Sequence, residues 1–288
     1  MPRPPETPII FTEHDDIMGM PFVGYRPHME AGIGMGRKAA EEGKNYRVSL
    51  VGYPGTGKTV YPQILARELP GYSFLYMKGN SLLRLGDAGE ILRELKNMES
   101  YLRKAPLIIA FDELDLLTPS RIIRPIGYTL VTGVMMDILD EKPEKTLTLV
   151  MANNPNNLDM AITSRLQYTL FFDLPDARVL GETLEGLTVP NPYEVGERLY
   201  AMAEKSNGRL VVRSVVQACG EMKERPNDPE KMAQLLFPHA PQFDLGQIAE
   251  YSREHTGYRM RSNAAIEYWQ GVAQNYKESD KGTQSSSN

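Results

Sequence analysis

The stretch GYPGTGKT, residues 52–59, decides the fold class of this chain. It matches the pattern G-x-x-x-x-G-K-[ST], in which backbone N–H groups surround a phosphate group. Glycines let the backbone turn inward without a clash of a Cβ atom, and the N-terminus of the following helix adds partial positive charge. The apolar run YRVSLVGY before it is typical of a buried strand, and VYPQILAREL after it is typical of a helix. The sequence therefore predicts a phosphate-binding loop between a strand and a helix.

The side chains of this loop have separate expected roles. Lys58 would reach the β- and γ-phosphates of a nucleotide, and Thr59 would place a hydroxyl on Mg²⁺. Pro62 falls in the first turn of the helix. A proline is tolerated there, because the N–H groups of the first turn have no partner within the helix. The residues expected to contact the nucleotide here are Pro54, Gly55, Thr56, Gly57, Lys58, Thr59 and Val60.

A second motif, LIIAFDELD at residues 107–115, places two carboxylates directly after an apolar run. Such a run is typical of a strand in a parallel sheet, and these sheets bind ligands at the carboxyl ends of their strands. Asp112 would complete the Mg²⁺ site with Thr59, and Glu113 would polarise the attacking water.

The rest of the chain alternates between strand and helix patterns up to about residue 175, and is helical after that point. This predicts an α/β fold: a P-loop parallel sheet flanked by helices, followed by a smaller α-helical lid domain. The expected parts are an extended, proline-rich segment at 1–13, the α/β domain at 14–175, the helical lid with a C-terminal extension at 176–275, and a disordered polar tail at 276–288.

Composition narrows the class of protein. The 288 residues carry a formal net charge of −5, which argues against broad coating of nucleic acid. The single cysteine, Cys219, cannot form an internal disulfide and suits a reducing compartment and a buried core position. No run of about 18 apolar residues predicts a membrane span, and the first ten residues lack a signal-peptide pattern, so we expect a soluble cytoplasmic protein.

The motifs occur in the order and spacing of a known family. GYPGTGKT, IIAFDELD and LVMANNPNNLDMAITSRLQYTLFFDLPD together resemble the AAA+ ATPases, and within them the AAA group proper, over about residues 15–222. The resemblance implies Mg²⁺-dependent ATP hydrolysis, with the two motifs above as Walker A and Walker B. It also places Asp16, Ile17 and Gly19 at the adenine, and Asn153 as the sensor that orients the attacking water, with Asn154 as second choice.

The resemblance also implies two arginines at the nucleotide. In ITSRLQY, Arg165 would point into the nucleotide site of the next subunit and stabilise charge on the γ-phosphoryl group. Many members carry a second arginine three residues later, where this chain has Tyr168, which puts a two-arginine mechanism in doubt. In SNGRLVVRSVV, either Arg209, as in pachytene-checkpoint remodellers, or Arg213 one turn on would act as the lid sensor.

The function expected from the resemblance is ATP-driven remodelling of a protein partner by a homo-oligomeric ring of six subunits. The segment SLLRLGDAGE lacks the aromatic pore element of the family's translocases and is similar to Rubisco activase, so Arg84 and Leu85 would form a weak grip at most. The alternative is a nucleic-acid-associated AAA+ ATPase, such as a helicase loader or clamp-loader relative. A third alternative is a scaffold that binds nucleotide without hydrolysing it.

Overall fold

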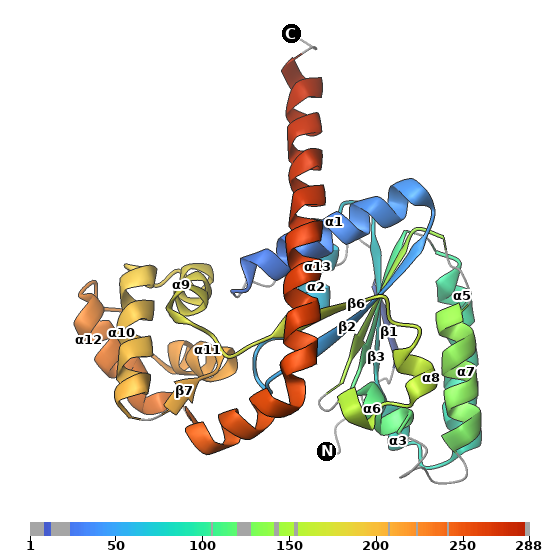
Figure 1. Ribbon diagram of the computed structural model, residues 1–288, viewed down its shortest axis with the longest axis horizontal. Coiled ribbons are helices and arrows are strands. Elements are labelled where there is room, and N and C mark those ends of the chain that lie inside the picture. The colour runs from blue at the N-terminus through green and yellow to red at the C-terminus, as the bar shows by residue number, and fades with distance from the viewer. Residues whose placement is uncertain are drawn as a thin grey trace.

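A mostly parallel sheet forms the centre of the larger part of the molecule (Figure 1). The computed structural model describes residues 9–12, 24–104, 106–119, 128–140, 144–152, 155–206, 208–222, 224–240 and 242–285. Within these residues the sheet has six strands in the order β1-β3-β4-β5-β2-β6. They are β1 Ile9–Thr12, β2 Asn45–Gly52, β3 Ser73–Lys78, β4 Leu107–Asp112, β5 Thr146–Met151 and β6 Tyr168–Phe172. Only β1 is antiparallel to its neighbour, β3, so the predicted α/β fold with a parallel sheet is confirmed.

The register of the strands brings the predicted functional residues to one edge of the sheet. Asp112 ends β4 opposite Lys78 of β3, and Gly52 ends β2 opposite Phe172 of β6. Strand β5 lies between β4 and β2. Because the carboxyl ends of parallel strands share an edge, the phosphate loop and the two carboxylates leave the sheet at the same edge, one strand apart.

Helices cover both faces of this sheet, and each face has its own apolar core. Strands β4 and β5 are buried along their whole length, as expected for strands covered on both sides. One face carries α1 Arg26–Glu42 and α2 Tyr61–Glu68. The other carries α3 Gly79–Leu83, α4 Ala88–Asn97, α5 Glu99–Leu102, α6 Leu114–Leu117 and α7 Tyr128–Asp140, with η2 Pro155–Asn157 and α8 Met160–Thr163 at the edge.

A smaller helical unit follows β6 and forms the lid. Its elements are α9 Ala177–Gly186, α10 Pro192–Lys205, β7 Gly208–Leu210, α11 Val212–Glu221, α12 Pro229–Leu236 and η3 Phe237–His239. Helices α9 and α10 cross closely at Gly196. The crossing needs a glycine there, because a Cβ atom would lie 2.7 Å from the backbone nitrogen of Gly181. Cys219 is buried in the lid core, where burial raises the pKa of its thiol to about 11.

The structure differs from the prediction in the second half of this region. The sequence predicts a helix from Arg209 onward, and most of it is α11, but Arg209 and Leu210 at its start belong to strand β7, which pairs with β8 Gln242–Asp244. Helix α13, Leu245–Ser285, then leaves the lid and packs against α1 and β6 (Figure 1). The region predicted as a lid with a C-terminal extension, 176–275, thus consists of the lid and of a helix that returns to the sheet. Helix is described up to Ser285, where a disordered tail from residue 276 is predicted.

Two contacts explain why α13 returns to the sheet. Trp269 is buried edge-on between Tyr46 and Tyr168, and Gly34 of α1 lies so close to α13 that a Cβ atom there would be 2.6 Å from the Trp269 carbonyl oxygen. The helix thus covers β6, which is one of the two edge strands of the sheet. No helix in the described ranges combines the length and apolar character that a membrane crossing needs.

Candidate nucleotide site

The phosphate loop begins where β2 passes very close to β6. Gly52 has a φ of 143°, and a Cβ atom on it would lie 2.1 Å from the Phe172 carbonyl oxygen, so the position requires glycine. Gly55 and Gly57 follow with φ values of 77° and 99°, which side chains with a Cβ atom rarely adopt. The glycines predicted from the motif therefore occupy the conformations that the loop needs.

Lys58 lies inside this loop rather than in solvent. Its ammonium donates hydrogen bonds to the carbonyl oxygens of Gly52 at 2.7 Å and Tyr53 at 2.6 Å. Burial lowers the pKa of Lys58 to about 8, while Asp112 raises it and Arg213 lowers it through their charges. These charge interactions show that the three side chains share one neighbourhood.

The helix after the loop begins later than the motif suggests. Residues 58–60 form a turn, in which the backbone N–H groups of Val60 and Tyr61 both donate to the Gly57 carbonyl. Pro62 stands in the first turn of α2, as predicted. Thr59 is exposed and lines the cavity described below, so its hydroxyl can reach a bound group.

The two carboxylates of the second motif have distinct surroundings. Asp112 is buried, and its Oδ2 accepts a hydrogen bond of 2.8 Å from the hydroxyl of Tyr76 on β3. The backbone N–H of Glu113 donates to Asp112 Oδ1 at 3.0 Å. Glu113 itself adopts a left-handed conformation with φ of 54°, and its buried Oε2 has no hydrogen-bond partner among the described residues. This oxygen is therefore not engaged by another group of the described chain.

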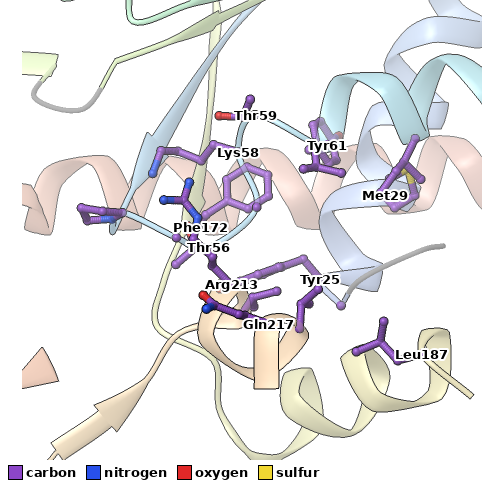
Figure 2. A pocket seen from close by; sticks show the side chains of 18 residues that line it. Tyr25, Met29, Thr56, Lys58, Thr59, Tyr61, Phe172, Leu187, Arg213 and Gln217 are labelled. Carbon is purple, nitrogen blue, oxygen red and sulfur yellow. The ribbon is translucent and has the colours of Figure 1, made fainter. Parts of the chain in front are cut away.

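A cavity of about 340 Å³ opens between the phosphate loop, α1 and the lid. Figure 2 shows Lys58, Thr56 and Arg213 gathered at the loop, with Met29 and Leu187 further along. The polar end is formed by the loop, Arg213 and Gln217. The remaining lining is mostly apolar: Gly24, Tyr25, Met29, Tyr61, Ile64, Phe172, Leu187, Val212 and Val216. An apolar compartment beside an anion cradle fits a flat base attached to phosphates.

Comparisons with known proteins agree with this geometry. Residues 48–174, which run from β2 to just beyond β6, match the family model described as "ATPase family associated with various cellular activities (AAA)". The chain contains an AAA ATPase domain.

Two curated relatives carry similar sequences. A "Putative 26S proteasome regulatory subunit homolog" of Methanocaldococcus jannaschii is 33% identical over 167 residues, which cover 56% of this chain and 44% of the relative. "Nuclear valosin-containing protein-like" of Mus musculus is 33% identical over 135 residues, which cover 44% of this chain and 15% of the relative. The aligned part thus spans less than half the length of either relative.

A solved structure supports the fold. The crystal structure of the FIGL-1 AAA domain aligns with a TM-score of 0.64 and 20% sequence identity, and covers 86% of this chain and 92% of that one. At this identity the likeness concerns the fold alone.

The two candidate lid arginines occupy different places. The backbone N–H of Arg213 donates to the Gly55 carbonyl at 2.9 Å, and its side chain lines the cavity. Arg209 instead pairs with Glu204 at 2.9 Å and lies 4.6 Å above the Tyr200 ring. Of the two alternatives, the structure brings only Arg213 to the phosphate loop.

The Arg165 side chain is paired within its own chain. Its Nη2 and Nε contact the Asp140 carboxylate at 2.6 and 2.9 Å, and its Nη1 donates to the Ala161 carbonyl at 2.7 Å. This pairing raises the pKa of Arg165 and lowers that of Asp140. Among the described residues Arg165 does not line the cavity, and Tyr168 packs against Tyr46 and Trp269.

Other predicted site residues fall outside the described residues: Asp16, Ile17 and Gly19 at the adenine, and the sensor asparagine Asn153 with its alternative Asn154. The roles assigned to them by resemblance stay predictions.

The loop expected to face a pore is short and turned inward. Leu85 packs against the apolar core on its own side of the sheet, and its backbone N–H donates to Leu82. Arg84 is exposed. Of the two residues proposed as a grip, Leu85 is therefore engaged within the subunit.

Sequence reasoning missed two polar residues of the site. Tyr76 lies two residues before Lys78 on β3, so strand alternation places it on the same face, next to Asp112. Gln217 lies one turn after Arg213 on α11 and lines the same cavity. Both could be found only once the partner strand and the start of α11 were known.

Proposed function

We propose that this chain binds ATP with Mg²⁺ and hydrolyses it in a homo-oligomeric ring of six subunits, and that hydrolysis drives remodelling of a protein partner. The observation that carries the proposal is the pairing of a phosphate cradle around Lys58 with the Asp112–Glu113 carboxylates at the same sheet edge. Two relatives bear names of a proteasome regulatory subunit homologue and a valosin-containing-like protein, which favours a protein partner over nucleic acid.

The residues divide the chemistry between them. Lys58 exchanges its two carbonyl partners for the β- and γ-phosphate oxygens, and Arg213 approaches the γ-phosphate from the lid. Mg²⁺ bound with the nucleotide supplies charge against the phosphates, and Thr59 and Asp112 are the side chains suited to hold it. Tyr76 keeps the Asp112 carboxylate in place.

Glu113 is the proposed general base. It takes a proton from a water molecule as the water oxygen bonds to the γ-phosphorus and the bond to the β–γ bridging oxygen breaks. Its left-handed backbone is sterically uncommon for a residue with a side chain, and Gly79 leaves room for it, because a Cβ atom there would lie 2.4 Å from the Glu113 carbonyl oxygen.

Glu113→Gln tests this proposal. We expect the variant to bind ATP with Mg²⁺ as tightly as the parent within about threefold and to hydrolyse it at least about 100-fold more slowly, because the amide cannot take the proton. Glu90→Gln on α4, an exposed carboxylate, is the matched control and should hydrolyse ATP at the parental rate. Parental turnover in Glu113→Gln would assign the base to another residue.

The same variant can identify the partner class. Held in the ATP state, Glu113→Gln should retain a protein client in a pull-down, and DNA binding should be weak and fall steeply with salt. Tight, sequence-dependent DNA binding without a retained protein would favour the nucleic-acid-associated alternative.

A further inference from the structure

An aromatic stack joins the phosphate loop to the C-terminal helix. Tyr53, the residue after Gly52 in the loop, is 2% exposed and packs its ring on Tyr251 of α13, with ring centroids 4.2 Å apart and planes 34° apart. Tyr251 in turn stacks on His255, one helical turn later, at 3.9 Å and 7°. The His255 Nδ1 makes a 2.8 Å hydrogen bond with the Tyr251 carbonyl, which fixes the imidazole below the phenol ring.

The base of this stack is fastened to the sheet. The backbone N–H of Phe171 on β6 donates to the Ser262 hydroxyl at 2.7 Å, and Arg259 pairs with Asp173 at 2.8 Å. The Arg259 guanidinium also lies 5.2 Å above the Phe171 ring. Strand β6 pairs with β2, and β2 leads into the phosphate loop. Helix α13 is therefore attached to the strand next to the one that carries the loop.

The residue that carries the stack also shapes the cradle. The Tyr53 carbonyl accepts hydrogen bonds from Lys58 Nζ at 2.6 Å and from the Thr56 hydroxyl at 2.7 Å. A shift of the Tyr53 side chain would move this carbonyl, and with it the Lys58 and Thr56 side chains that donate to it. The loop has no other large aromatic anchor between residues 52 and 59.

We propose that Tyr251 is a positioning residue for nucleotide binding: through its stack on Tyr53, helix α13 holds the phosphate loop in the conformation that accepts a nucleotide. The inference rests on the proposed function in one respect, namely that this loop binds a nucleotide. In this arrangement the affinity for nucleotide depends on the position of α13. A ligand or partner that displaces the first turns of α13 therefore weakens nucleotide binding.

The test is binding of a fluorescent ADP analogue to the full chain, together with steady-state ATP hydrolysis. Tyr251→Ala should weaken ADP binding by about 2- to 10-fold, the range expected for loss of an aromatic pair. It should raise KM by a similar factor and leave kcat within about twofold, because the chemical groups are untouched. Tyr251→Phe keeps the ring and should bind ADP like the parent.

Tyr268→Ala is the matched control, since Tyr268 is an exposed tyrosine of the same helix that contacts Trp269 and not the loop. It should leave ADP affinity unchanged. Parental affinity in Tyr251→Ala, or a loss in Tyr251→Phe as large as in Tyr251→Ala, would overturn the inference.

A double variant separates this coupling from general damage to the fold. If Tyr53 and Tyr251 act as one stack, Tyr53→Leu with Tyr251→Ala should bind ADP no more weakly than the weaker single variant. If the losses of ADP affinity in the two single variants multiply in the double variant, the coupling is contradicted.

The inference and the proposed function can fail separately. A parent chain that binds ADP without hydrolysing ATP would overturn the proposed hydrolysis and not this inference. Normal hydrolysis with unchanged ADP affinity in Tyr251→Ala would overturn only this inference.

Discussion

Among single residues, Lys58 has an environment that makes a pH-dependent prediction. Burial lowers its pKa to about 8 in the free protein, and a bound phosphate favours the charged form. ATP binding therefore takes up a proton above pH 8, so the affinity should be full below that pH and fall by up to about tenfold per pH unit above it. Titrations between pH 7 and 9.5 measure this dependence.

Lys58→Arg provides the control for that titration. The guanidinium stays charged throughout this range, so whatever affinity the variant has should be flat with pH. Equal slopes in the parent and in Lys58→Arg would show that another group causes the dependence.

The two lid arginines give a second prediction at this scale. Arg213→Ala should weaken ATP binding by about 10- to 100-fold, the range for a lost charge-assisted hydrogen bond, because Arg213 lines the cavity. Arg209→Ala is the matched control and should change the affinity by less than about twofold, since Arg209 pairs with Glu204 on the lid surface. The opposite ranking, measured by nucleotide titration, would contradict the assignment.

The sequence predicted single residues well where a local motif determines the backbone. Gly52, Gly55, Gly57 and Lys58 stand as the loop motif requires, because each depends only on neighbouring residues. Arg209 and Arg213 could not be separated, because the choice depends on β7 ending at Leu210 and on its pairing with β8, 32 residues later. Long-range pairing of this kind leaves little trace in local periodicity.

Among the elements, the crossing of α1 and α13 is the most sensitive to substitution. Gly34→Ala would place a Cβ atom 2.6 Å from the Trp269 carbonyl oxygen, so the helices must separate. We expect the free energy of unfolding to fall by about 1–3 kcal/mol, as for other overpacked contacts, measured by urea denaturation.

Gly133→Ala on α7 is the control for the crossing. A Cβ atom there meets no described atom within 4 Å, so removal of a helical glycine should stabilise the protein by about 0.5–1 kcal/mol. A Gly34→Ala protein as stable as the parent would show that the close approach of α13 does not matter.

The pattern of α13 also shows a limit of prediction from sequence. The sequence predicts helix and a C-terminal extension here, but all helical segments after residue 175 have similar periodicity, so it does not show which surface the extension covers. Which surface a helix covers depends on shape, here on Gly34 and on the aromatic pocket around Trp269. The parallel α/β sheet, by contrast, follows from the strand–helix alternation and the loop motif. The strand order does not, and neither does β1 at Ile9–Thr12, which lies in the segment predicted to be extended.

At the scale of the whole molecule, the proposed ring would complete each nucleotide site with an arginine from a second subunit. Within the described residues, the cavity receives Lys58 and Arg213 from its own chain, while Arg165 pairs with Asp140 on another surface. The proposed ring brings Arg165 of one subunit to the γ-phosphate of the next. Either substitution alone, Lys58→Ala or Arg165→Ala, should therefore abolish most hydrolysis.

The most direct measurement of this account is ATP hydrolysis after mixing the Lys58→Ala and Arg165→Ala proteins. A shared site predicts that turnover appears on mixing, because the intact loop of an Arg165→Ala subunit meets the intact Arg165 of a Lys58→Ala neighbour. Mixed samples that assemble like the parent and yet stay as inactive as the separate proteins at every ratio would contradict it.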